Sequence, residues 1–118
     1  MQIFFYTKNV ELEDADMEYM KERLEKLQKK FFSESVQFFV NVEKTRGDLH
    51  GDDLYEVSIR VEDGAERYFA EDRRDSITNT FDVAYDDLKR IVRKERGKSR
   101  ALLKRAGRKI KQLLRRKK

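Results

Sequence analysis

The sequence has no cysteine and only one histidine, His50, among its 118 residues. Without cysteine the chain cannot form a disulfide bond, a thiolate metal site or a cysteine nucleophile. His50 lies in a segment rich in glycine and aspartate, so we interpret it as a solvated loop residue and not as a metal ligand or general base. The sequence also lacks a glycine-rich phosphate loop and any metal or nucleophile signature. These absences predict a protein with no cofactor and no small-molecule substrate.

Adjacent carboxylates occur at Asp52-Asp53 and at Asp86-Asp87. The second pair falls in a predicted helix, where neighbouring side chains point about 100° apart, so its carboxylates do not converge on a metal ion or a reacting atom. The sequence thus has no convergent catalytic set. This argues against one alternative function, an enzyme that uses no nucleotide.

Long apolar runs are missing as well. No window approaches the run of about 18 apolar residues that a membrane-spanning helix needs. Residues 1–8 lack the charged start and apolar stretch of a signal peptide. The length suits one domain. We therefore expect a single-domain cytoplasmic protein that does not associate with a membrane.

Charge is distributed very unevenly along the chain. The last thirty residues carry sixteen Lys and Arg and one acid, Glu95, whereas the first eighty-eight carry twelve Lys and Arg and twenty-two acids. The overall net charge of +5 therefore combines an acidic part with a strongly basic end. A dense cationic end predicts binding to a polyanion, and nucleic acid is the obvious polyanion in a cell.

Apolar spacing predicts six elements in the order β-α-β-β-β-α. Alternating residues predict strands over residues 3–7, 36–43, 55–62 and 65–71. Apolar residues at helical spacing predict a helix ending near Phe31 and a second helix that begins after the N-cap residue Ser76. Asp63-Gly64 is expected to form a two-residue hairpin turn, and residues 44–53 a polar loop.

This order predicts an α+β fold. Three strands in succession favour an antiparallel meander, and the first strand returns beside it through the first helix. The result is a two-layer sandwich, with two helices on one face of a four-stranded sheet. The other face is expected to be open and polar, while Phe38, Tyr55 and Tyr68 are expected to fill the core.

Cations on the two helices are the candidate RNA-binding residues. On the second helix they span about two turns and surround it, whereas the favourable effect of a helix dipole on cations fades within one turn. On the first helix, intervening glutamates could instead neutralise the cations at i,i+4 spacing. The candidates are Lys89, Arg90, Arg93, Lys94 and Arg96 on the second helix, and Arg23, Lys26, Lys29 and Lys30 on the first.

Gly97 is expected to end or loosen the second helix. We interpret residues 97–118 as a basic C-terminal extension that is disordered when free and helix-prone on a polyanion. Lys98 and Arg100 extend the candidate RNA-binding set into this segment. Its apolar stripe is thin and contains no Trp or Phe, which argues against the alternative of binding to an anionic bilayer.

Residues 1–96 resemble the ribosome hibernation promoting factor family, also called ribosome-associated inhibitor A. The likeness rests on residues 19–31 (YMKERLEKLQKKF), on the step Ala70-Glu71 and on residues 81–90 (FDVAYDDLKR). Near the start of the second helix the family often has an aromatic residue and two alanines. Here those positions are Thr78, Asn79 and Thr80.

The resemblance implies a non-enzymatic factor that binds the small ribosomal subunit where messenger and transfer RNA would lie. Such factors block initiation and preserve idle ribosomes during stress, and the basic faces of their two helices contact ribosomal RNA. The chain is too short for the dimerisation domain of long members, so we expect the short form, a monomer away from the ribosome. The main alternative is a general double-stranded RNA- or DNA-binding module.

Overall fold

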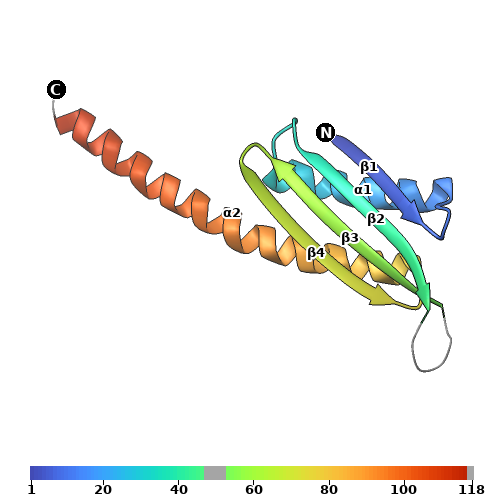
Figure 1. Ribbon diagram of the computed structural model, residues 1–118. Helices are drawn as coiled ribbons and strands as arrows, with labels where there is room; N and C mark the ends of the chain where they lie inside the picture. The colour runs from blue at the N-terminus through green and yellow to red at the C-terminus, as the bar shows by residue number, and fades with distance from the viewer. Residues whose placement is uncertain (47–52, 117–118) are drawn as a thin grey trace.

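The computed structural model describes the backbone of residues 1–46 and 53–116 and the side chains of residues 1–45 and 53–96. Its elements are β1 (Gln2–Lys8), α1 (Asp14–Phe31), β2 (Gln37–Arg46), β3 (Asp53–Asp63), β4 (Glu66–Arg74) and α2 (Ile77–Arg116). The sheet has the order β1-β2-β3-β4; β1 runs parallel to β2 and the other neighbours are antiparallel. Both helices cover one face of the sheet (Figure 1). The predicted α+β sandwich is confirmed.

The core lies between the sheet and the helices. Every second side chain of the central strands points into the core, and Phe38, Val57 and Ile59 are completely buried. The helices contribute side chains at spacings of three and four, among them Leu24 and Phe81. Tyr68 is only partly buried against the edge of this cluster. The core stripes therefore follow the sequence pattern closely, because each element can bury only one face.

The strands are longer than predicted, and the hairpin turn is shifted by one residue. Residues 44–46 belong to β2 and do not form the start of a loop; His50 and Asp52 lie outside the described residues. Asp63 pairs with Glu66, so the turn residues are Gly64 and Ala65. Gly64 has a φ of 63°, which glycine tolerates without a steric penalty. Asp63 is the last residue of β3, and its carboxylate bonds to residues outside the hairpin, as described below.

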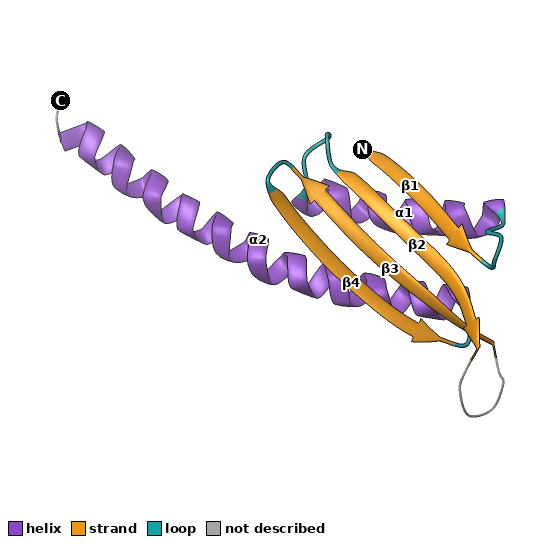
Figure 2. Cartoon of the chain, viewed as in Figure 1, coloured by secondary structure: helices purple, strands orange, loops and turns teal. Residues whose placement is uncertain are grey.

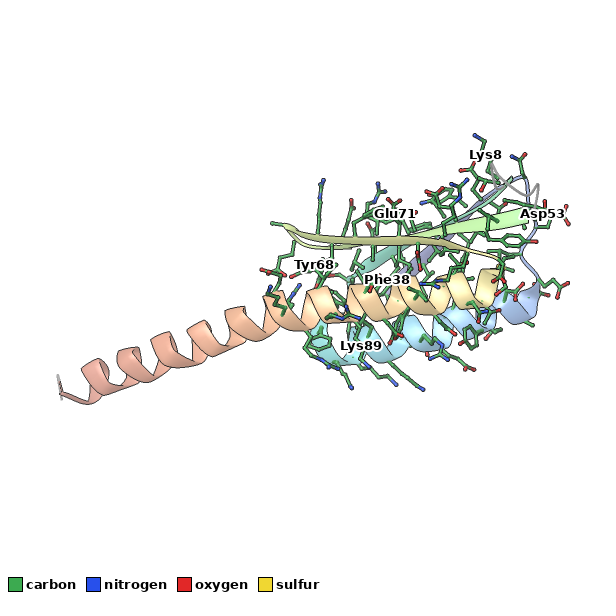
Figure 3. The ribbon with its side chains drawn as sticks, turned by 90° about the horizontal axis from the view of Figure 1, so that it is seen from below. Lys8, Phe38, Asp53, Tyr68, Glu71 and Lys89 are labelled. Atoms are coloured by element: carbon green, nitrogen blue, oxygen red, sulfur yellow. The ribbon has the colours of Figure 1, made fainter. Side chains whose placement is uncertain are left out.

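The sequence predicted that the open face of the sheet is polar, but this face also carries aromatic side chains. Phe4, Phe39, Arg60 and Phe69 lie opposite one another across all four strands. The rings of Phe4 and Phe39 stack with 5.2 Å between centroids, and the Arg60 guanidinium lies 4.4 Å from the Phe39 centroid. An aromatic row therefore crosses this face between charged residues. Figure 3 shows Lys8 and Glu71 on the same side, away from the helices.

Helix α2 begins as predicted but does not end at Gly97. The Asn79 amide donates a hydrogen bond to the Ser76 Oγ at 3.2 Å, which is the expected N-cap. The helix then continues for 40 residues to Arg116, and its second half projects away from the sheet (Figure 2). Each of its two interior glycines, Gly97 and Gly107, costs the helix about 1 kcal/mol, and the surrounding Lys, Arg, Leu and Ala are good helix formers. The helical backbone crosses residue 96 without a break. The division of the chain into two parts at this residue stays a prediction.

Candidate nucleic-acid interface

The cations of α1 are placed by the way this helix packs. Met20, Leu24 and Leu27 face the sheet and are buried. Most of the remaining positions carry charges, with Asp14 and Asp16 in the first turn and lysines in the last. This order suits the helix dipole, which is positive at its N-terminus and negative at its C-terminus. The lysines are therefore concentrated at one end of the helical layer.

A groove of about 440 Å³ lies between α1 and α2 at this end. Leu27 and Tyr85 contribute apolar surface to it, and Asp86 is the one carboxylate among its lining residues. Its basic lining residues are Arg23, Lys26, Lys29, Lys30 and Lys89. The structure thus brings all four candidates from the first helix together with one from the second. Figure 3 shows Lys89 on the helical side of the molecule. We call this set of residues the basic groove.

Two tyrosines fix the walls of the basic groove relative to each other. The Tyr85 hydroxyl donates a hydrogen bond to the backbone carbonyl of Arg23 at 3.0 Å, and the Tyr19 hydroxyl donates one to Asp82 Oδ1 at 2.6 Å. Burial raises the pKa of Tyr85; burial and then the bond to Asp82 raise the pKa of Tyr19. Both hydroxyls therefore remain protonated donors at neutral pH. The helical spacing of apolar residues carries no signal for this bridging role of Tyr85.

Arg23 has a structural role in addition to lining the groove. Its Nε lies 3.5 Å from Asp82 Oδ1, and its guanidinium lies 4.4 Å from the centroid of the Tyr19 ring. These contacts orient the guanidinium, and the carboxylate of Asp82 partly neutralises its charge. Arg23 therefore helps to hold α1 against α2 more than it offers a free cation.

The lysines of the basic groove, in contrast, are not neutralised. Among the side chains that the structure describes, no carboxylate oxygen lies within 4.0 Å of the ammonium group of Lys26, Lys29, Lys30 or Lys89. The alternative in which glutamates of α1 pair with these lysines is therefore not realised. Four ammonium groups around a shallow apolar floor have the chemistry that binding of phosphate groups requires, since each can neutralise one phosphate.

The other candidates on α2 point in several directions. Arg93 is exposed and lies one turn beyond Lys89, so it continues the same side of the helix. Lys94 is exposed as well. Arg90 lies 3.7 Å from Asp87 and lines a depression beside β4, not the basic groove. The cations surround the helix as predicted, but only part of the set faces α1. The side chains of Lys98 and Arg100 lie outside the described residues.

The side chain of Arg96 lies away from the basic groove and makes contacts within the domain. Its side chain is only 21% exposed, and its Nη2 lies 2.9 Å from Asp63 Oδ2. Its Nε contacts the carboxylate of Glu66, and its guanidinium lies 5.3 Å from the centroid of the Phe32 ring. We therefore assign Arg96 to the packing of α2 on the β3–β4 turn. In the sequence Arg96 lies close to Arg93, Lys94 and Lys98, so the pattern could not single it out.

Asp63 is the centre of this anchor. Its carboxylate accepts hydrogen bonds from the Ser33 amide at 3.0 Å and from the Ser33 hydroxyl at 2.6 Å. Burial alone would raise the pKa of Asp63, but the bonds from Ser33 and the charge of Arg96 outweigh it and place the pKa below its ordinary value. The anchor joins the α1–β2 connection, the β3–β4 hairpin and α2 at one point.

The domain is thus a two-layer α+β sandwich with a lysine-lined groove on its helical side. Its described residues contain no group of three or more side chains that could hold a metal ion. Residues 3–100 match the family of the sigma 54 modulation protein / S30EA ribosomal protein, and the chain belongs to this family. The family match confirms the resemblance read from the sequence. It also extends four residues beyond the predicted boundary at residue 96.

Two solved structures share the fold. One is the N-terminal domain of Protein Y from Thermus thermophilus, with a TM-score of 0.64 and 20% identity over 80% of this chain and 98% of that one. The other is a ribosomal subunit interface protein from Coxiella burnetii, with a TM-score of 0.64 and 18% identity over 80% of this chain and 96% of that one. No curated protein sequence matches the chain.

Family membership defines the class of function. Members are ribosome-binding factors without enzymatic activity, and the chain is a ribosome-associated protein of this kind, consistent with a role in ribosome hibernation and translation inhibition. Among the described residues, helices of the length and apolarity needed to cross a bilayer do not occur.

Proposed function

We propose that the protein binds the small ribosomal subunit in the path of messenger and transfer RNA and blocks translation during stress. The observation that carries the proposal is the basic groove, whose four lysines have no carboxylate partner among the side chains that the structure describes. The site of action is then the cytoplasm, where ribosomes work. The mechanism is steric and electrostatic: the folded domain occupies the channel, while the lysines bind phosphate groups of ribosomal RNA.

The second half of α2 adds a further contact in this proposal. Residues 97–118 carry eleven Lys and Arg and no acid. The helical backbone carries this charge away from the sheet as far as Arg116 (Figure 1). A rod of this kind extends along ribosomal RNA beyond the channel and increases the affinity there. The acidic first part of the chain limits binding to RNA elsewhere and orients the domain by repulsion.

Binding to ribosomes is expected to be strongly salt-dependent. If Lys26, Lys29, Lys30, Lys89 and Arg93 each neutralise one phosphate, affinity falls roughly 10²–10³-fold between 50 and 200 mM salt. The measurement is co-sedimentation with small subunits across this range, with free duplex RNA as the competitor. Preference for the duplex over the subunit would favour the alternative function, a general double-stranded RNA- or DNA-binding module, and would contradict the proposal.

Truncation after Arg96 tests the projecting half of α2. We expect the shortened protein to bind the small subunit less tightly and with a shallower salt dependence, because fewer phosphates are neutralised. The melting temperature serves as the control, since Arg96 retains its contacts with Asp63 and Glu66 in the truncated chain. Unchanged affinity together with an unchanged salt dependence would reject this role for the segment.

A further inference from the structure

One carboxylate stands among the cations of the basic groove. Asp86 lines the groove together with Arg23 and the four lysines. It lies three residues before Lys89, so the two side chains are neighbours on the same side of α2. A carboxylate in this position repels phosphate groups and weakens the binding that the lysines favour. The groove therefore contains a group that phosphate neutralisation does not explain.

The carboxylate of Asp86 has no partner among the side chains that the structure describes. No Lys or Arg nitrogen lies within 4.0 Å of its oxygens, and no described group donates a hydrogen bond to them. The nearby acids of α2 differ, since Asp82 lies 3.5 Å from Arg23 and Asp87 lies 3.7 Å from Arg90. Asp86 is also exposed. Its oxygens are thus available to a ligand in the groove.

The chemistry of a carboxylate restricts what this ligand can be. An ionised carboxylate accepts hydrogen bonds and cannot donate them. A ligand that contacts Asp86 must therefore present a donor while its phosphates bind the lysines. The ribose of RNA meets this requirement, because each 2′-hydroxyl lies close to the phosphates of the chain and can donate its proton. DNA has no hydroxyl there, and this difference lets proteins distinguish the two nucleic acids.

We propose that Asp86 is a specificity-determining residue of the basic groove, whose carboxylate accepts a hydrogen bond from a ribose 2′-hydroxyl of bound RNA. The lysines neutralise the phosphates on either side of that ribose. Lys89, one turn further along α2, is placed to contact a phosphate next to the sugar that Asp86 binds. The inference deepens the proposed function and rests on it, because it assigns the preference for RNA to the same groove.

The consequence of this arrangement is selectivity more than affinity. Toward DNA the carboxylate of Asp86 only repels phosphate, whereas toward RNA a charge-assisted hydrogen bond offsets the repulsion. Removal of the carboxylate should therefore strengthen the binding of DNA, while the binding of RNA gains less or becomes weaker. The ratio of the two affinities isolates the hydrogen bond, because the loss of one negative charge affects two chains with equal numbers of phosphates alike.

The test compares two single-stranded probes that differ only in the 2′-hydroxyl, an oligouridine and its 2′-deoxyuridine counterpart of equal length. Fluorescence anisotropy of the labelled probes at low salt gives the ratio of their affinities for the full chain. The wild type should bind the oligouridine more tightly. Asp86→Ala should lower this preference about tenfold, which is the effect of losing one hydrogen bond to a charged group.

Asp87→Ala is the matched control, because it removes the same charge from the next residue. Asp87 pairs with Arg90 and lines the depression beside β4, not the basic groove. This variant should keep the preference of the wild type for the oligouridine. The proposal is overturned if the wild type shows no such preference, if Asp86→Ala retains it, or if Asp87→Ala loses it to the same extent.

An oligocytidine and its 2′-deoxy counterpart test a base amino group as the donor, since cytosine carries an amino group that a carboxylate can bind. If Asp86→Ala removed a preference for cytidine equally in RNA and DNA, the contact would be with the base and the proposal would be wrong. No ribosome enters this assay. Failure of the proposed function would therefore appear in co-sedimentation with small subunits, and failure of this inference in the ratio of oligonucleotide affinities.

Discussion

Reversing three charges of the basic groove, by Lys26→Glu, Lys29→Glu and Lys89→Glu together, is expected to lower the affinity for small ribosomal subunits about 10²–10³-fold. Each lysine that contacts a phosphate contributes about one unit to the slope of log affinity against log salt, so the slope should also fall by about three. The added glutamates would join Asp86 in the groove and repel phosphate. The measurement is co-sedimentation at several salt concentrations.

The control for this variant carries the same change of net charge on the other side of the molecule. Lys8→Glu, Arg60→Glu and Arg73→Glu together alter three cations of the open sheet face, each one on a different strand. Their combined effect on affinity should be far smaller, because no phosphate is expected at that face. An equal loss in both triple variants would mean that net charge alone drives binding and that the basic groove is not the interface.

The groove triple variant should leave the fold intact. Lys26 and Lys29 are exposed, Lys89 is half-buried at the rim of the groove, and none of the three makes an ion pair with another described side chain. Exposed substitutions away from caps, cores and ion-pair networks change stability by about 0.5 kcal/mol or less. A melting temperature close to that of the wild type therefore ties any loss of binding to the groove itself.

The fold could be predicted because it depends on the pattern of apolar residues within each strand and each helix. Alternation in the strands and helical spacing in α1 and α2 each identify one buried face, and burying those faces together leaves few arrangements of six elements. Ser76 predicted the start of α2 correctly, because an N-cap residue bonds only to backbone groups of the next few residues. Features of this kind need no knowledge of distant residues.

Other features depend on contacts between residues far apart in the chain. Asp63 belongs to β3 and not to the turn, and its carboxylate bonds to Ser33, thirty residues earlier. The aromatic row became visible only when the strand register placed Phe4 beside Phe39. Whether a lysine of α1 pairs with a glutamate or stays free also depends on packing, since i,i+4 spacing permits both. These outcomes lie beyond any pattern within one element.

Arg96 and Arg93 offer the clearest separation of folding from binding on a single helix. Arg96→Ala is expected to destabilise the protein by about 2 kcal/mol, because it leaves the buried carboxylate of Asp63 without its cation. For a chain of this size the melting temperature should fall by about 8 °C. The loss is smaller than for a fully enclosed ion pair, since the second partner of Arg96, Glu66, is 44% exposed. Thermal unfolding followed by circular dichroism measures both values.

The dependence on pH identifies the cause of this loss. The pKa of Asp63 is lowered in the folded state, so its contribution to stability is present above its unfolded pKa of about 3.9 and disappears as the pH falls through the folded value. The difference in stability between wild type and Arg96→Ala should therefore be largest near neutral pH and shrink below about pH 4. A difference that stays constant with pH would attribute the effect to lost packing on Phe32 instead.

Arg93→Ala, three residues earlier, should give the opposite result. Arg93 is exposed and makes no ion pair with a described side chain, so its loss should leave the melting temperature nearly unchanged. It should weaken binding to small subunits uniformly and lower the salt slope by about one. Arg96→Ala, assayed well below its melting temperature, should retain the slope of the wild type. If Arg96→Ala instead lowered the slope without changing stability, Arg96 would contact RNA, as its basic neighbours in the sequence suggested, and its contacts with Asp63 and Glu66 would not anchor α2.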